Sequence, residues 1–275
     1  MSLPPSRLIV FGDSFSDVGN AFALFGDETI PSPPHWKGRR CNGPLWVERL
    51  AELLALPAPI PSLRGGSGHA HGGACSGGGL SPIRAVPNLL EQVERFLAAP
   101  PGGPVDPEAL VVLRAGANDC LTAPWPIGPA CGETINANLL AAVHTLADAG
   151  ASRFLIPTEL PWGSSPIVPA SLTPEDRTAL NGLIAAQNDH LGRALLELAA
   201  ARRLRIVQPD LHGLFLEILA TPAAFGFHNV TLPALPDHPE ADGFLWWDER
   251  AHLTTAAHGL IAARAHAALT SRSAP

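Results

Sequence analysis

The chain has 275 residues, of which 46% are hydrophobic and 16% charged, so it can bury a sizeable core and is not intrinsically disordered as a whole. Its 25 acidic residues outnumber its 18 basic ones, and this net charge of −7 argues against nucleic acid or an anionic membrane as a partner. The longest apolar runs have about five residues, against the ~18 that span a bilayer, so we expect no integral membrane association. No secretory signal is visible at the start, and we leave localisation open between the cytoplasm and export with a signal removed.

Short apolar runs in the chain predict buried strands. They lie at 8–11, 110–113, 154–156 and 204–207. Each is too short for an amphipathic helix, and continuous apolar runs of this length are typical of strands that are covered on both faces.

The stretches without proline predict the helices, because proline breaks a helix interior. They are 45–56, 130–156, 175–208 and 240–274. The clearest start is at Thr173, a hydroxyl N-cap that Pro174 and two acidic residues follow. Strands that alternate with helices indicate an α/β fold with a mostly parallel sheet. No repeat or linker divides the chain, so we expect one domain over residues 1–275.

A serine follows the first predicted strand, where the loops of an open α/β sheet bind ligands. Ser14 lies there between Asp13 and the turn that contains Asp17. Its hydroxyl can point into the crevice beside backbone N–H groups of the turn. The alternative is that Asp13, Ser14 and Asp17 are only turn and N-cap residues.

One histidine has carboxylates close before it in the sequence. Asp248 lies four residues and Glu249 three residues before His252. In a tight turn, such a carboxylate can accept a hydrogen bond from one imidazole nitrogen and leave the other nitrogen free as a general base. The alternative is that His252 caps the last helix.

Two further segments could stabilise a developing negative charge. Asn118 follows the strand at 110–113 and offers a side-chain amide. Eight glycines lie between Gly65 and Gly79, and their backbone N–H groups can approach a ligand closely. The alternative is a flexible surface loop, which glycine richness alone favours.

Together, these segments follow the order of a known pattern. The chain reads FGDSFSDVGN at 11–20, HAHGGA at 69–74 and GAND at 116–119, and a last block contains Trp247, Asp248 and His252. In these blocks it resembles the GDSL branch of the SGNH hydrolase superfamily, and the resemblance runs from about residue 8 to about residue 268.

The resemblance implies a three-layer α/β/α sandwich with a flavodoxin-like, mostly parallel sheet of about five strands. It implies that Ser14 is the nucleophile, that His252 is the base and that Asp248 orients the histidine. The N–H groups of Ser14 and Gly73 and the side chain of Asn118 would form the oxyanion hole. We expect no metal and no other cofactor.

The sequence departs from the family pattern at one point. The family usually has two residues between its last Asp and His, whereas three separate Asp248 from His252 here. Either the turn bulges by one residue, with Asp248 as the orienting acid, or Glu249 takes that role. The choice of Gly73 over Gly72 rests on the register of a doubled glycine.

The expected activity is that of a serine esterase or lipase acting on a small-molecule, lipid or carbohydrate ester. One alternative is an acyltransferase, which uses the same residues with an alcohol acceptor. The other is a catalytically silent carbohydrate- or lipid-binding module. Acyl length, alcohol moiety and oligomeric state are left open.

Competing candidates for the chemistry are weaker. Ser76 lies in a near match to the nucleophile elbow, but the glycines after it disfavour the helix that an elbow needs. Cys75 has no base fixed beside it. His69 and His71, with His35, are a weak metal-site pattern.

Two more features are left open by the sequence. Cys120 and Cys131 flank a loop rich in proline and glycine and could close it with a disulfide. Trp125 and Trp162 lie in loops after predicted strands and could line an acyl or sugar pocket.

Overall fold

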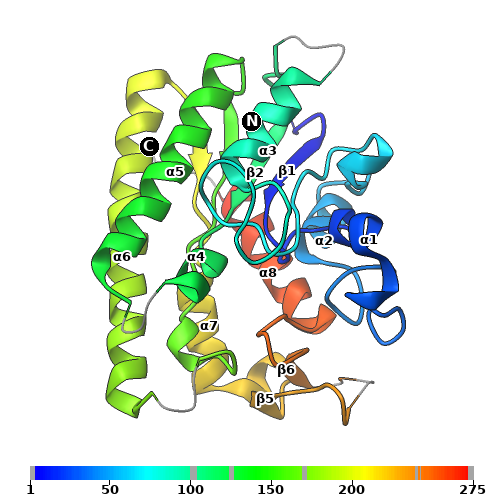
Figure 1. Ribbon diagram of the computed structural model, residues 1–275. Coiled ribbons are helices and arrows are strands. Elements are labelled where there is room, and N and C mark those ends of the chain that lie inside the picture. The colour runs from blue at the N-terminus through cyan, green and yellow to red at the C-terminus, as the bar shows by residue number, and fades with distance from the viewer. Residues whose placement is uncertain are drawn as a thin grey trace.

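The computed structural model describes residues 4–99, 104–123, 127–168, 172–238, 241 and 243–271. Its main sheet has four parallel strands in the order in which they occur in the chain (Figure 1). They are β1 (Leu8–Gly12), β2 (Leu110–Arg114), β3 (Arg153–Leu155) and β4 (Arg205–Val207). Each predicted strand is confirmed to within one residue at either end.

The main sheet has fewer strands than the expected five, but a fifth segment runs beside it. The N–H of Val10 donates to the carbonyl of Ser67, and the Val10 carbonyl accepts from the N–H of His69 at 2.7 Å. Further on, the N–H of His71 donates to the carbonyl of Gly12 at 3.0 Å. The glycine-rich segment is therefore held along β1, and it reaches the carboxyl end of that strand.

The register places the ends of β1 and β2 level with each other. Leu8 pairs with Leu110 at one end and Gly12 with Arg114 at the other. The segments that follow the two strands, which contain Ser14 and Asn118, therefore start from the same edge of the sheet.

Each proline-free stretch contains a helix, although the last stretch becomes helical only at Thr255, and further helices lie outside these stretches. They are α1 (Asn20–Phe25), α2 (Trp46–Leu53), α3 (Leu89–Ala98), α4 (Ala117–Thr122), α5 (Pro129–Asp148), α6 (Pro174–Arg202), α7 (Leu211–Ala220) and α8 (Thr255–Thr270). The start of α6 is as predicted, because the hydroxyl of Thr173 accepts from the N–H of Asp176 at 3.1 Å. Helices α1, α3, α4 and α7 were not predicted.

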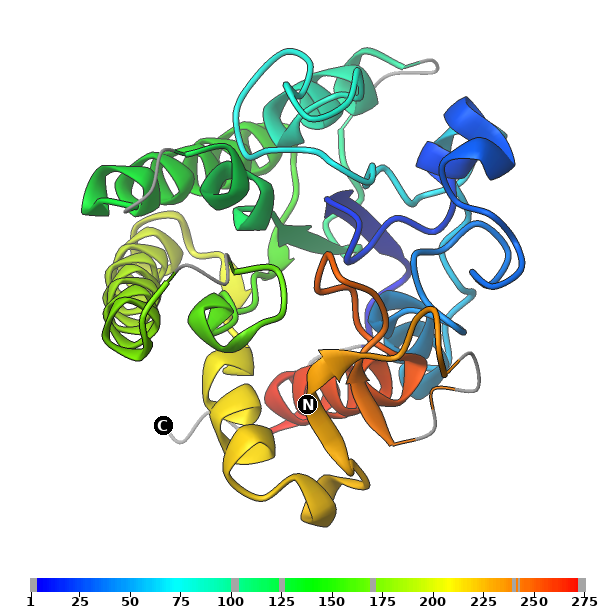
Figure 2. The same ribbon diagram turned by 60° about the horizontal axis from the view of Figure 1, so that its bottom comes forward.

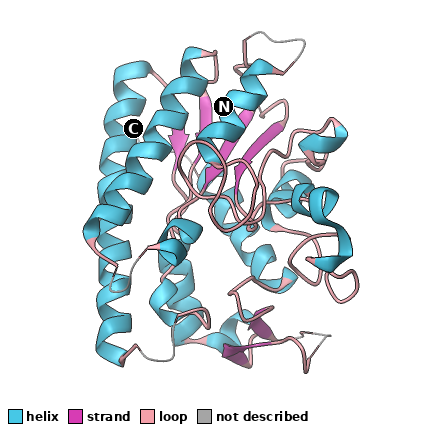
Figure 3. Cartoon of the chain, in the orientation of Figure 1, coloured by secondary structure: helices cyan, strands magenta, loops and turns pink. Residues whose placement is uncertain are grey.

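The helices cover both faces of the sheet, so that the sheet and the two sets of helices form three layers (Figures 1 and 3). Alternate residues of β1 enter different clusters: Leu8 and Val10 pack with α2, α7 and α8, whereas Ile9 and Phe11 pack with α3 and α5. Helix α6 contributes to both, through its first half on one face and its second half on the other. None of the described helices is long and apolar enough to cross a membrane.

A small two-stranded sheet lies apart from the main sheet (Figure 2). Its strands are β5 (Asn229–Pro233) and β6 (Phe244–Trp246), which run parallel. Strand β6 leads directly into the segment from Asp248 to His252, so this sheet fixes where that segment begins.

Candidate active site

The turn that carries Ser14 begins at a glycine that no other residue could replace. Gly12 has φ 144°, and a Cβ built on it would lie 2.0 Å from the carbonyl oxygen of Arg114. The side chain of Gln92, from α3, accepts from the Gly12 N–H at 2.9 Å and donates to its carbonyl at 2.8 Å. Helix α3 thereby fixes the end of β1, two residues before Ser14.

The two aspartates beside Ser14 have the structural roles that the sequence left open as an alternative. Asp13 accepts from the N–H of Phe15 at 2.9 Å and pairs with Arg114. Asp17 accepts hydrogen bonds from four backbone N–H groups, those of Gly19, Asn20, Ala21 and Gly72. Asp17 thus joins the Ser14 turn to the glycine-rich segment.

The structure brings His252 to Ser14 across 238 residues of sequence. Nε2 of His252 lies 3.0 Å from Oγ of Ser14. On the other side of the ring, Nδ1 lies 2.8 and 2.7 Å from the two carboxylate oxygens of Asp248. A serine, an imidazole and a carboxylate in this order form a proton-transfer chain.

The turn between Asp248 and His252 accommodates its extra residue through the backbone. Ala251 has φ 59°, and its N–H donates to the carbonyl of Asp248 at 3.1 Å. The Asp248 carboxylate also accepts from the N–H groups of Arg250 and His252. Burial alone would raise the pKa of Asp248, but the His252 ring and these hydrogen bonds lower it to about 2.

Glu249, the alternative orienting acid, lies elsewhere. Its side chain is 76% exposed, against 6% for that of Asp248, and its nearest basic partner is Arg250 at 3.9 Å. Asp248 is therefore the carboxylate in contact with the ring.

The backbone N–H groups of Ser14 and Gly73 are candidates for an oxyanion hole. No described residue accepts a hydrogen bond from the N–H of Ser14 or of Gly73, and both residues line the same cavity. The N–H of Gly72, in contrast, is occupied by Asp17 at 2.7 Å. Gly73 also has φ 94°, a conformation that favours glycine. Of the two glycines, Gly73 has the free donor.

Asn118 lies in the wall of the same cavity and connects it to the glycine-rich segment. Its Nδ2 donates to the carbonyl of Ala74 at 2.8 Å. An amide nitrogen has two hydrogens, so this bond fixes the group and leaves one donor for a ligand. The carbonyl of Gly73 accepts from the Ser81 hydroxyl at 2.6 Å, which fixes the next peptide as well.

The competing serine, Ser76, is part of the support for this segment. Its hydroxyl donates to Asp119 at 2.6 Å and accepts from the amide of Asn138 at 2.9 Å. It is fully buried, has no histidine beside it and is followed by turns rather than by a helix. Burial raises the pKa of the neighbouring Cys75 thiol to about 11.

The remaining candidates from the sequence do not form a second site. His69 stacks on Phe11, and Nδ1 of His71 bonds the carbonyl of His69 at 2.7 Å. Nδ1 of His35 accepts from the indole N–H of Trp247. No group of three potential metal ligands lies among the described residues. Cys120 and Cys131 are free thiols with their sulfur atoms 3.9 Å apart, and Trp125 lies outside the described residues.

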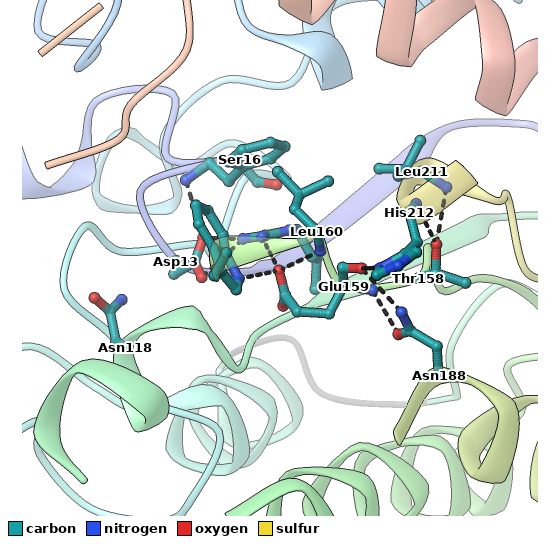
Figure 4. A network of polar contacts seen from close by, with 12 residues as sticks. Asp13, Ser16, Asn118, Thr158, Glu159, Leu160, Asn188, Leu211 and His212 are labelled. Atoms are coloured by element: carbon teal, nitrogen blue, oxygen red, sulfur yellow. Dashed lines mark hydrogen bonds and ion pairs between the residues drawn. The ribbon is translucent and has the colours of Figure 1, made fainter. Parts of the chain in front are cut away.

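Beneath the Ser14 turn lies a buried ion network that the sequence analysis missed (Figure 4). One nitrogen of Arg114 bonds both carboxylate oxygens of Asp13 at 3.0 Å, and the other lies 2.5 Å from Glu159. The guanidinium also lies 3.9 Å from the centre of the Phe15 ring. Asp13 and Phe15 flank Ser14, so this network supports the turn on both sides of the serine.

Further groups hold Glu159 in place. Its carboxylate accepts from the indole N–H of Trp162 at 2.9 Å, and its backbone is bound at both ends by the amide of Asn188. Asp13 and Glu159 raise the pKa of Arg114 in spite of burial, which favours its charged form. Two acids at the ends of β1 and β3, either side of a basic residue at the end of β2, would have been the signal to look for.

A cavity of about 290 Å³ opens beside Ser14 and His252. Trp162, one of the two tryptophans expected in a pocket, lines it. Its apolar wall continues with Ala117, Cys120, Ile127, Ile167, Val168, Leu180 and Ile184. A largely apolar pocket with a few convergent polar groups is typical of a site for an organic ligand.

The sequence was compared with known proteins. A family model described as GDSL-like lipase/acylhydrolase matches residues 8–265. The chain is 28% identical over 225 residues to the phosphatidylcholine-sterol acyltransferase of Aeromonas hydrophila, covering 82% of this chain and 64% of that protein. It is 26% identical over 281 residues to the thermolabile hemolysin of Vibrio parahaemolyticus, covering 94% of this chain and 62% of that protein. The chain thus spans somewhat less than two thirds of the length of these relatives.

Among solved structures, the acetylxylan esterase Axe2 of Geobacillus stearothermophilus is similar. It shares 18% sequence identity with this chain at a TM-score of 0.48, and the match covers 98% of this chain and 97% of the other.

Proposed function

The chain belongs to the GDSL-like lipase/acylhydrolase family, and from this premise we propose that it is a serine esterase that cleaves carboxylic esters through an acyl-enzyme. The observation that carries the proposal is the distance of 3.0 Å between Oγ of Ser14 and Nε2 of His252, with Asp248 on the far side of the ring. Both reacting groups line the cavity in which an ester would bind.

In the first half of the reaction, Oγ of Ser14 attacks the ester carbonyl while Nε2 of His252 takes its proton. The Asp248 carboxylate holds Nδ1–H and stabilises the imidazolium that forms. The carbonyl oxygen becomes an oxyanion, which the N–H groups of Ser14 and Gly73 and the Asn118 amide accommodate. His252 then protonates the alcohol, which leaves.

In the second half, water takes the place of the alcohol. His252 removes a proton from the water, the resulting hydroxide attacks the acyl carbonyl, and the proton is returned to Ser14 as the carboxylic acid leaves. The apolar wall on the Trp162 side of the cavity is suited to the acyl chain. An alcohol in place of water would give acyl transfer through the same groups.

The test is hydrolysis of 4-nitrophenyl butyrate by the wild type and by Ser14→Ala. We expect release of nitrophenolate by the wild type and a rate at least about 10³-fold lower in the variant, with unchanged circular dichroism. Adding a series of alcohols and measuring new ester product distinguishes acyl transfer from hydrolysis. Undiminished turnover by Ser14→Ala would overturn the proposal.

A further inference from the structure

The cavity beside Ser14 has a basic wall as well as an apolar one. Four arginines line it, and one of them, Arg114, is paired with Asp13 and Glu159. The other three, Arg40, Arg84 and Arg250, make no salt bridge within the described residues except a contact of 3.9 Å between Arg250 and Glu249. Esterase chemistry on a neutral ester gives these cations no role.

Arg84 lies beside the proposed oxyanion hole with an unused donor. Its Nη1 is buried and has no hydrogen-bond partner among the described residues. Its guanidinium lies 5.2 Å from the centre of the Phe25 ring. The Cβ of Arg84 is also close to Gly73, because a Cβ built on that glycine would lie 3.4 Å from it. A buried charged donor without a partner is unfavourable unless a ligand supplies an acceptor.

Arg40 completes the buried part of this wall. One of its nitrogens donates to the carbonyl of Thr29 at 2.8 Å, which fixes the side chain, and it forms no salt bridge with a described carboxylate. Burial and the charge of Arg84 lower the pKa of Arg40, and burial and the charge of Arg250 lower that of Arg84. The three cations are thus near enough to repel one another.

The carboxylates of Asp17 and Asp248 act on these arginines through their charge but form their hydrogen bonds with other groups. Asp17 accepts its four backbone hydrogen bonds, and Asp248 is bound to His252. A group with one or two negative charges would therefore supply the hydrogen-bond acceptor that Arg84 lacks.

The basic wall shares the cavity with His252, the residue that protonates the leaving alcohol in the proposed mechanism. Arg250 is two residues before His252, which protonates the alcohol, and the charge of Arg40 contributes to the low pKa of Asp248. The apolar wall is built instead from segments that follow β2 and β3 and from the first half of α6. In Figure 2 the chain before α2 (blue) lies at the β1 end of the sheet, and α6 (yellow-green) lies at the opposite end.

We propose that Arg40, Arg84 and Arg250 form a subsite for an anionic group, a phosphate or a carboxylate, on the alcohol portion of the ester. The inference rests on the proposed esterase function and names its substrate class. Planar guanidinium groups bind both anions through paired hydrogen bonds, so the shared chemistry is an oxyanion held beside the leaving oxygen.

Two pairs of esters with the same acyl chain test the subsite. The first pair compares 4-nitrophenyl butyrate with 3-carboxy-4-nitrophenyl butyrate, and the second compares 1-butyrylglycerol with 1-butyrylglycerol 3-phosphate. We expect kcat/KM to be at least about tenfold higher for the anionic member of at least one pair at low ionic strength, and the ratio to shrink in high salt. The pair with the larger ratio identifies the carboxylate or the phosphate as the natural anion.

Variants of Arg40 and Arg84 test whether these residues cause the preference for anionic esters. We expect Arg84→Gln and Arg40→Gln each to lower the anionic-to-neutral ratio by about tenfold, mainly through KM for the anionic ester. Arg49→Gln is the matched control, because Arg49 lies on α2, pairs with Glu52 at 3.6 Å and is not in the cavity wall; it should leave the ratio unchanged. A cooperative thermal unfolding transition for each variant would verify that it is folded.

The outcomes separate the two proposals. Turnover of the neutral esters with ratios near one in both pairs overturns the anionic subsite and leaves the esterase function standing. Equal losses on neutral and anionic esters in Arg84→Gln and Arg40→Gln also overturn the subsite. No turnover of any ester by the wild type overturns the esterase function itself.

Discussion

The carboxylate of Asp248 lies 2.7 Å from Nδ1 of His252, although three residues rather than two separate them. Ala251 absorbs the additional residue by adopting φ 59°. The relationship matters for the proposed mechanism, because a fixed Nδ1–H leaves Nε2 unprotonated toward Ser14.

The pair Asp248→Asn and Glu249→Gln tests which acid orients the histidine. Asparagine at 248 cannot stabilise the imidazolium and favours the wrong tautomer, so we expect kcat for 4-nitrophenyl butyrate to fall by about 10³- to 10⁴-fold. Glu249 is exposed, and Glu249→Gln should change kcat by less than about twofold. A larger loss in Glu249→Gln than in Asp248→Asn would reverse the assignment.

Asn118→Ala tests the side-chain donor of the oxyanion hole. We expect kcat to fall by about 10²- to 10³-fold with a small change in KM, because the donor acts on charge that develops in the transition state. Asn118 also holds the carbonyl of Ala74, so a loosened segment could mimic this effect.

Asn138→Ala serves as the matched control for that variant. Its amide supports the same segment through Ser76, but Asn138 does not line the cavity. If Asn138→Ala lowered kcat as much as Asn118→Ala, the support of the segment, and not the donor, would explain the loss.

The strands and the helices α2, α5, α6 and α8 could be predicted from the sequence, because continuous apolar runs indicate burial and proline-free stretches indicate a continuous helical backbone. Helix α3 (Leu89–Ala98) was missed, although the stretch between Pro87 and Pro100 is as long as the stretch at 45–56 that predicts α2. That omission hid Gln92, whose amide fixes the end of β1.

The candidate site also contains residues that could be chosen from the sequence and residues that only the structure reveals. Ser14, Asn118 and His252 stand in recognisable blocks and were chosen from them. Arg114 ends an apolar strand and meets partners 101 and 45 residues away, so only the folded chain reveals its role. The orienting acid depended on the φ of Ala251, which the sequence does not report.

Arg114→Met tests the ion network beneath the Ser14 turn. The substitution leaves two buried carboxylates, Asp13 and Glu159, without their cation, and we expect the free energy of unfolding to fall by about 3–5 kcal/mol. Urea unfolding at pH 7 measures this. Arg95→Met breaks only an exposed pair with Glu91 on α3, so it should cost less than about 1 kcal/mol.

If Arg114→Met were as stable as Arg95→Met, the network would be replaceable by packing alone. The double variant Arg114→Met/Glu159→Gln refines the test. It removes one of the uncompensated charges and should recover part of the lost stability.

Buried histidines predict a loss of stability in mild acid. Burial lowers the pKa of His35 and His69 from 6.5 to about 4 and that of His258 to about 3. Below pH 6.5 these groups are protonated in the unfolded chain but stay neutral in the folded one. Unfolding therefore takes up protons, and the free energy of unfolding falls as the pH drops from about 6.5 to about 4.

His258→Leu isolates one of these groups. Between pH 6 and 4, the slope of unfolding free energy against pH should be shallower than in the wild type by about 1.4 kcal/mol per unit. His190→Leu, at an exposed position on α6, is the control and should keep the wild-type slope. An unchanged slope in His258→Leu would contradict the neutral, buried state of that ring.

Covalent labelling of the nucleophile tests the account most directly. The wild type, Ser14→Ala and Ser76→Ala are each treated with an alkyl fluorophosphonate, and peptide masses locate the modified residue. We expect one phosphonyl group on Ser14 in the wild type and in Ser76→Ala, and none in Ser14→Ala. Labelling that persists in Ser14→Ala, or that disappears in Ser76→Ala alone while its fold is retained, would contradict it.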